Sequence, residues 1–127
     1  MADVTAMLPQ RPLARVTVIA SLVASFCFVS ACAPLRDDAA ALLDRGRYGD
    51  ALDELVREEG DAARYRGGAR ARYALYRGLA HLALGDAPST DTWLSEAKSR
   101  FDDDPRCLSA SDAGRLLDAW QSLGRGR

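Results

Sequence analysis

Residues 69–101, ARARYALYRGLAHLALGDAPSTDTWLSEAKSRF, decide the fold. Residues 69–84 predict an amphipathic helix, because apolar side chains recur at helical spacing. The side chains expected on its buried face are Tyr73, Tyr76, Leu79, Ala80, Ala83 and Leu84. Gly85 is expected to end this helix, with Pro88 and Ser89 in a turn. A second helix is expected over residues 90–101, with Trp93, Leu94, Ala97 and Phe101 on its apolar face.

The same reasoning predicts two helices before this pair. One begins near Ala39, capped by Asp37 or Asp38, and ends at Gly46. The next follows Tyr48 and Asp50 and runs to Gly60, burying Ala51, Leu52, Leu55 and Val56. Residues 60–68 are expected to form a polar connection in which Gly67 and Gly68 are a flexible joint.

One helix is predicted after the pair. Asp102, Asp103, Asp104 and Pro105 are expected to form a breaking loop, and Ser109 with Asp112 an S-x-x-D capping box. The helix, residues 111–123, is expected to bury Ala113, Leu116, Leu117, Trp120 and Leu123. No period-two apolar run or hairpin turn predicts a strand. We therefore expect an all-α domain over residues 39–123, about five helices in antiparallel hairpins, followed by a disordered tail at 124–127.

Two segments share a pattern. Gly46 is followed by Ala51 and Leu55 at offsets of 5 and 9, and Gly85 by Thr90 and Leu94 at the same offsets. This resembles the tetratricopeptide repeat, a helix pair in which small residues allow close packing; the matching residues are Gly46, Tyr48, Ala51, Leu55, Gly78, Gly85, Asp86, Leu94 and Ala97. The resemblance spans residues 39–105 and implies a short solenoid with the last helix as a cap. The glycines are 39 residues apart, against about 34 in the family, and Ala87 and Thr90 depart from its pattern.

The N-terminal segment predicts export. Arg11 and Arg15 precede residues 16–31, VTVIASLVASFCFVSA, which carry no charge. The run ends in Val29, Ser30, Ala31 and Cys32, which resemble a bacterial lipobox. That resemblance implies a signal peptide over residues 1–31, cleavage between Ala31 and Cys32, lipidation of Cys32, and a tether over residues 32–38.

Two other outcomes stay open at this segment. Uncharged sequence continues from residue 16 to 35, which is about long enough to span a bilayer uncleaved. Ordinary signal peptidase cleavage near Ala31 or Ala33 is the other outcome. All three place the later residues outside the cytoplasm. In a diderm bacterium, the lack of Asp after the cysteine implies, by resemblance, the periplasmic face of the outer membrane.

Composition excludes some partners. The chain has 17 basic and 18 acidic residues, so it lacks the basic excess of a nucleic-acid-binding protein. Of three cysteines, Cys27 would leave with the signal and Cys32 would be lipidated. Cys107 would then have no intramolecular disulfide partner. A partly buried thiol is favoured over an intermolecular disulfide.

No residue set predicts catalysis, a cofactor or a metal site. His81 is the single histidine, and a metal needs several convergent ligands. Asp102, Asp103 and Asp104 lack the EF-hand spacing. Ser109 and Ser111 are better explained as helix caps. We expect no enzyme.

A cluster of arginines is the unusual surface feature: Arg64, Arg66, Arg70 and Arg72, with Tyr65 among them. Guanidinium groups suit carboxylates and phosphates, although a solvated face is the favoured explanation. The expected function is a membrane-tethered adaptor or accessory subunit of an envelope assembly, with an unidentified protein partner. A plain lipid-anchored spacer and an accessory subunit of an envelope enzyme are the alternatives.

Overall fold

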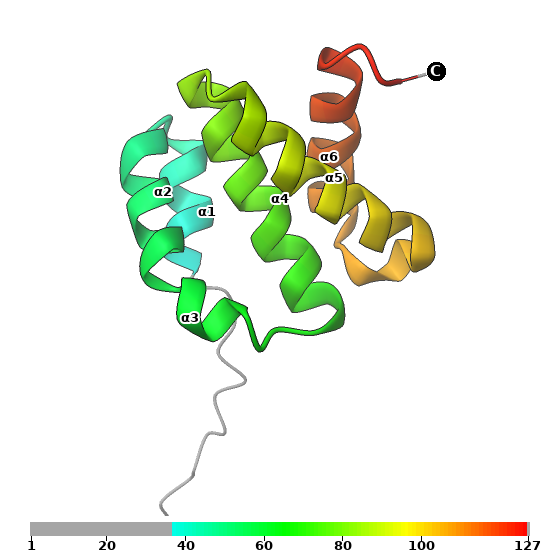
Figure 1. The fold of residues 1–127 in the computed structure, drawn as a ribbon, viewed down its shortest axis with the longest axis horizontal. Coiled ribbons are helices and arrows are strands. Elements are labelled where there is room, and N and C mark those ends of the chain that lie inside the picture. Colours follow the sequence, from blue (N-terminus) through cyan, green and yellow to red (C-terminus); the bar gives the residue numbers. More distant parts are fainter. Residues whose placement is uncertain (1–36, 127) are drawn as a thin grey trace, which may run out of the picture.

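The helices of the fold lie side by side, with α1 and α2 on one side, α4 and α5 in the middle and α6 on the other side (Figure 1). A computed structural model describes residues 37–126. The signal segment, the lipobox and most of the tether lie outside the described residues. The described part is all-helical and contains no strand, which confirms the all-α prediction.

Six α-helices and one 3₁₀ turn make up the described chain. They are α1 (Asp37–Asp44), α2 (Tyr48–Arg57), α3 (Glu59–Ala62), α4 (Gly67–Leu84), α5 (Ala87–Asp103), η1 (Pro105–Cys107) and α6 (Ala110–Ser122). α1 pairs with α2, and α4 pairs with α5. α2 packs against α4, and α6 contacts both α4 and α5. Each hairpin thus packs on the next element in the chain.

The turn between α4 and α5 forms for a local reason. Gly85 has φ +78°, a left-handed conformation that favours glycine. Asp86 caps α5, because its Oδ1 accepts a hydrogen bond of 3.2 Å from the Ser89 backbone N–H. α5 therefore begins at Ala87, and the prediction of a turn at Pro88 is wrong. Proline fits the first turn of a helix, where its missing N–H has no acceptor to lose.

Small residues bring the helices of the core together. Ala51 and Ala97 have no exposed surface. A Cβ built on Gly78 would lie 2.5 Å from Leu94 Cδ2 and 2.6 Å from Leu94 Cγ. The backbone of α4 thus contacts the Leu94 side chain of α5 at a distance that only glycine permits.

Further helix limits differ from expectation. Asp102 and Asp103 lie inside α5 and not in a breaking loop, because the helix continues to Asp103. Asp37 lies inside α1 and not before it. Gly60 does not end a helix but lies in α3, which occupies part of the expected polar connection. Gly67 and Gly68 open α4, and a Cβ on Gly68 would lie 2.5 Å from the Cys107 carbonyl oxygen. Gly68 is therefore a close-packed contact and not a flexible joint.

Some residues expected in the core are on the surface. Val56 is 46 % exposed, Leu84 51 % and Leu117 39 %. Among the described residues, no neighbouring side chains pack closely enough to bury these three.

The expected disordered tail is attached to α5 as far as the structure describes it. Arg125 forms an ion pair with Asp91, and its guanidinium lies 5.2 Å from the centre of the Trp120 ring. Lys98 lies 5.7 Å from the same ring. These contacts join the end of the chain to the last hairpin.

Candidate interaction surface

One stripe of α4 lies between α1 and α6. Arg72, Tyr76, Leu79 and Ala83 follow one another at intervals of four, three and four residues, so they lie on one face of the helix. α1 and α6 both contact α4. We call this surface, with its walls on α1 and α6, the inner groove. It is hollowed at both ends, and Tyr76, which lies between the two hollows on α4, is 2 % exposed.

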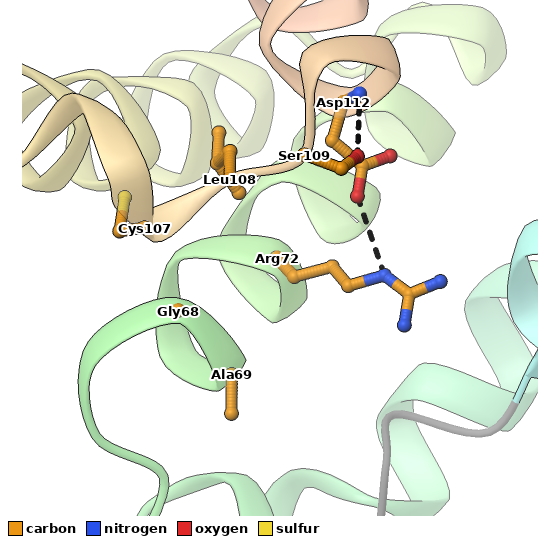
Figure 2. A pocket seen from close by; sticks show the side chains of 7 residues that line it. All are labelled: Gly68, Ala69, Arg72, Cys107, Leu108, Ser109 and Asp112. Carbon is orange, nitrogen blue, oxygen red and sulfur yellow. Dashed lines mark hydrogen bonds and ion pairs between the residues drawn. The ribbon is translucent and has the colours of Figure 1, made fainter.

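The first hollow lies where α4 and α6 begin. It measures 480 Å³ and is lined by Gly68, Ala69, Arg72, Cys107, Leu108, Ser109 and Asp112. Figure 2 shows the Arg72 side chain extending from α4 toward Asp112 on α6. Ser109 caps α6, because its Oγ accepts a hydrogen bond of 3.1 Å from the Asp112 backbone N–H. The cap predicted at Ser109 is therefore confirmed, whereas Ser111 lies inside α6 and is exposed.

Three polar side chains are linked beside this hollow. The Tyr76 hydroxyl donates to Asp112 Oδ1 at 3.0 Å, and Arg72 Nε donates to the Tyr76 oxygen at 3.0 Å. Arg72 Nε also lies 3.3 Å from Asp112 Oδ2. Burial raises the pKa of Tyr76, although the hydrogen bond from Arg72 opposes this. The phenol is therefore protonated at neutral pH and remains the donor to Asp112.

The second hollow lies where α1 and α4 end. It measures 400 Å³, and its lining is mostly apolar: Leu43, Asp44, Tyr48, Leu79, Leu82, Ala83 and Arg115. Arg115 Nη2 on α6 donates to Asp44 Oδ1 on α1 at 2.7 Å. This ion pair joins the two walls of the groove.

The arginines singled out in the sequence do not form one cluster. Arg70 and Arg72 point about 200° apart on α4, and Arg72 belongs to the inner groove. Arg70 forms a two-pronged ion pair with Glu96 on α5, at 2.6 and 3.0 Å. Arg64 and Arg66 are exposed beside half-buried Tyr65. A role of this patch in partner binding stays a prediction, and it now concerns the exposed Arg64 and Arg66 alone.

Sequence reasoning missed a cation–aromatic cluster on the opposite side of α4. Arg77 is 8 % exposed, and its guanidinium lies 4.6 Å from the centre of the Trp93 ring. Its Nη1 donates to the Tyr73 hydroxyl at 2.9 Å, and that hydroxyl donates to the Leu55 carbonyl at 2.8 Å. Tyr73 and Trp93 meet edge to face at 5.7 Å. These contacts connect α2, α4 and α5, so the cluster stabilises the fold.

The remaining candidates have structural roles in the described residues. His81 is 9 % exposed, with Nδ1 3.2 Å from Asp86 Oδ2. Asp102 pairs with Lys98 at 2.6 Å, and Asp104 accepts from the Arg106 backbone N–H at 3.0 Å. Residues 37–126 contain no group of three potential metal ligands.

Cys107 is half-buried between the first hollow and a smaller one. Burial raises the pKa of its thiol, and the charge of Asp104 adds to this effect. The neutral thiol therefore predominates, which makes Cys107 a weak nucleophile.

Comparison with known proteins gives no assignment. The chain matches no protein family, no curated protein and no solved structure. Within residues 37–126, no helix has the length and apolar character needed to cross a membrane.

Proposed function

We propose that this chain is a lipid-tethered adaptor of the bacterial cell envelope that binds a partner protein at the inner groove. The observation that carries the proposal is the alignment of two hollows along one stripe of α4, with an ion pair joining the groove walls. The apolar lining of the second hollow can accept a side chain of a partner protein.

The chemistry of the groove supports binding over catalysis. Its charged side chains pair with one another, Arg72 with Asp112 and Arg115 with Asp44. The thiol that lines the first hollow is held in its neutral form by burial, which raises its pKa. Leu79 and Leu82 offer apolar surface to a bound side chain. The groove thus presents hydrogen-bonding and apolar surface in the pattern of a protein-binding site.

The sequence supports the tether and the resemblance. Val29, Ser30, Ala31 and Cys32 follow an uncharged run as a lipobox does. Two helix pairs with small residues at their contacts are in keeping with the tetratricopeptide resemblance. By resemblance, the protein would lie on the periplasmic face of the outer membrane in a diderm bacterium.

The anchor is tested by the intact mass of the membrane-extracted protein. For wild type, we expect a species that begins at Cys32 and carries the mass of acyl chains. For the Cys32→Ser variant, we expect no species with acyl mass. A species that retains residues 1–31, or one that begins at Cys32 without acyl mass, contradicts the tether.

The groove is tested by a matched pair of substitutions. Ala83→Trp fills the second hollow from an exposed position, and Ser99→Trp adds the same side chain at an exposed position of α5 away from it. We expect a protein that co-purifies from detergent-solubilised membranes with wild type and Ser99→Trp, and is lost with Ala83→Trp. Equal thermal unfolding of both variants excludes misfolding. Equal capture by both contradicts groove binding and favours a plain spacer.

A further inference from the structure

The last helix of the described chain, α6, buries little apolar surface against the rest of the domain. It lies at one side of the molecule (Figure 1). Its buried residues are Asp112, Leu116 and Ala119, so Leu116 is the one large apolar side chain of α6 that is buried. α4, in comparison, buries nine residues, Tyr73 and Tyr76 among them. Because a segment with few buried apolar contacts opens at a lower free energy than the core, α6 should detach more readily than α4.

Ion pairs attach α6 and the residues just after it to three other helices. Within the described chain, the pairs to α4, α1 and α5 are Arg72–Asp112, Arg115–Asp44 and Arg125–Asp91. The last two are open to solvent, because the side chains are 32 % and 57 % exposed in Arg115–Asp44 and 42 % and 52 % in Arg125–Asp91. Salt screens exposed charges, with a Debye length of about 10 Å at 0.1 M and about 3 Å at 1 M. The attachment of α6 should therefore weaken as the salt concentration rises.

The connection before α6 is not helical. Leu108 and Ser109 link η1 to α6, and both have extended backbone, with ψ angles of 149° and 160°. Leu108 is buried, whereas the side chain of Ser109 caps α6 and belongs to that helix. Hinges of moving elements are a few residues at element ends that absorb the change in dihedral angles. α6 can therefore turn away at this connection without breaking another helix.

Opening of α6 changes the two hollows together. Ser109 and Asp112 of α6 or its cap line the first hollow, and Arg115 of α6 lines the second. Tyr76 separates the hollows, is 2 % exposed, and donates its hydroxyl hydrogen bond to Asp112. When α6 moves away, Tyr76 loses this acceptor and a covering helix. The two hollows then join in one surface along α4.

We infer that α6 is a lid that opens as a unit, independently of α4, and that the exposed pairs Arg115–Asp44 and Arg125–Asp91 are its latch. The closed lid keeps the two hollows separate, and the open lid exposes Tyr76 between them. Salt shifts the equilibrium toward the open lid, because it weakens the latch. This inference concerns the domain alone and does not depend on the adaptor function proposed above.

Hydrogen exchange of the full chain in detergent, read by mass spectrometry, tests the lid. A detached helix of 13 residues is marginal in water, so opening exposes the amides of α6 to exchange. We expect the amides of α6 to exchange faster than those of α4. Raising NaCl from about 0.05 M to about 0.5 M should accelerate α6 further and leave α4 unchanged.

Two substitutions remove the latch without changing a residue of α6. An exposed ion pair shifts an equilibrium by about 1.5- to 5-fold, so Asp44→Asn and Asp91→Asn should each accelerate exchange in α6 by about this factor. The double variant should show about the product of the two factors. The matched control is Asp50→Asn, which removes an exposed pair with Arg47 beside α2 and should leave α6 unchanged.

Hydroxyl-radical labelling of the double variant at about 0.5 M NaCl tests the joining of the hollows. Labelling of Tyr76 should rise relative to wild type, whereas Tyr73, which has no exposed surface, should stay unlabelled. Three results overturn the inference. Equal exchange of α6 and α4, or equal acceleration of both by the variants, shows that α6 does not open alone. Exchange of α6 that responds neither to salt nor to the double variant shows that the pairs are no latch. Unchanged labelling of Tyr76 shows that opening does not join the hollows.

Discussion

Substituting Gly78 by alanine tests the close packing of α4 on α5. The added Cβ would lie 2.5 Å from Leu94 Cδ2, 2.6 Å from Leu94 Cγ and 3.1 Å from the Leu94 backbone nitrogen. Favourable carbon contacts are about 3.5–4.0 Å, so the two helices or the leucine must move by about 1 Å. Leu94 has no exposed surface, which leaves its side chain no free space.

The expected magnitude follows from two opposing effects. Overpacking a core costs about 1–3 kcal/mol, and alanine in place of glycine stabilises a helix by about 0.5–1 kcal/mol. We expect a net loss of about 1–2 kcal/mol. In a domain of this size that lowers the Tm by roughly 4–16 °C. Circular dichroism of the full chain, melted in the same detergent as wild type, measures the shift.

A matched substitution separates the clash from the change in helix propensity. Gly114 lies in α6, and a Cβ there has no atom within 4 Å, so Gly114→Ala should raise the free energy of unfolding by up to about 1 kcal/mol. Leu94→Ala should cost less in the Gly78→Ala background than in wild type, because it removes the clashing atoms. A Gly78→Ala protein as stable as wild type would refute the packing argument.

Three further predictions follow from single contacts. Ser109→Ala removes the cap of α6 and should lower the free energy of unfolding by about 1 kcal/mol in urea titration; no change would show that another group caps the helix. Tyr73→Phe leaves the Leu55 carbonyl and the Arg77 guanidinium without their hydroxyl partner and should cost about 1–3 kcal/mol by the same measurement; wild-type stability would contradict it. Burial acts to raise the pKa of Glu96, but its arginine partners outweigh burial and lower the pKa, so its stabilisation is present above the unfolded pKa of about 4.3 and is lost as pH falls through the folded pKa. Glu96→Gln should therefore flatten the acid limb of a stability–pH profile, and an unchanged limb would contradict this.

The sequence was sufficient for the elements whose signals are local. Gly46 and Gly85 end their helices because glycine adopts positive φ without steric cost. Ser109 caps α6 as the S-x-x-D pattern predicts. Apolar spacing predicted α2, α4, α5 and α6, although the exposed Val56 and Leu117 show that spacing marks a face and not its depth of burial.

The start of α5 and the role of Gly68 were not accessible in the same way. Pro88, three residues after Gly85, fits a loop turn as well as the first turn of a helix. The hydrogen bond that the Asp86 side chain accepts from the Ser89 N–H decides for the helix. Gly68 looked flexible beside Gly67, but its neighbour is the Cys107 carbonyl, 39 residues later in the chain. Sequence spacing carries no information about such a contact.

The candidate site, too, has features that the sequence predicted and features that only the structure decided. By itself, the sequence determined four of the helices (α2, α4, α5 and α6), the helix ends at Gly46 and Gly85 and the lipobox pattern at Cys32, because helical periodicity, glycine turns and a short motif act over a few neighbouring residues. Only the tertiary structure decided that Arg72 meets Asp112 and that Arg115 reaches Asp44, 71 residues away. The inner groove exists because α4 contacts both α1 and α6, and Gly78 lets α4 pack closely on α5 behind it.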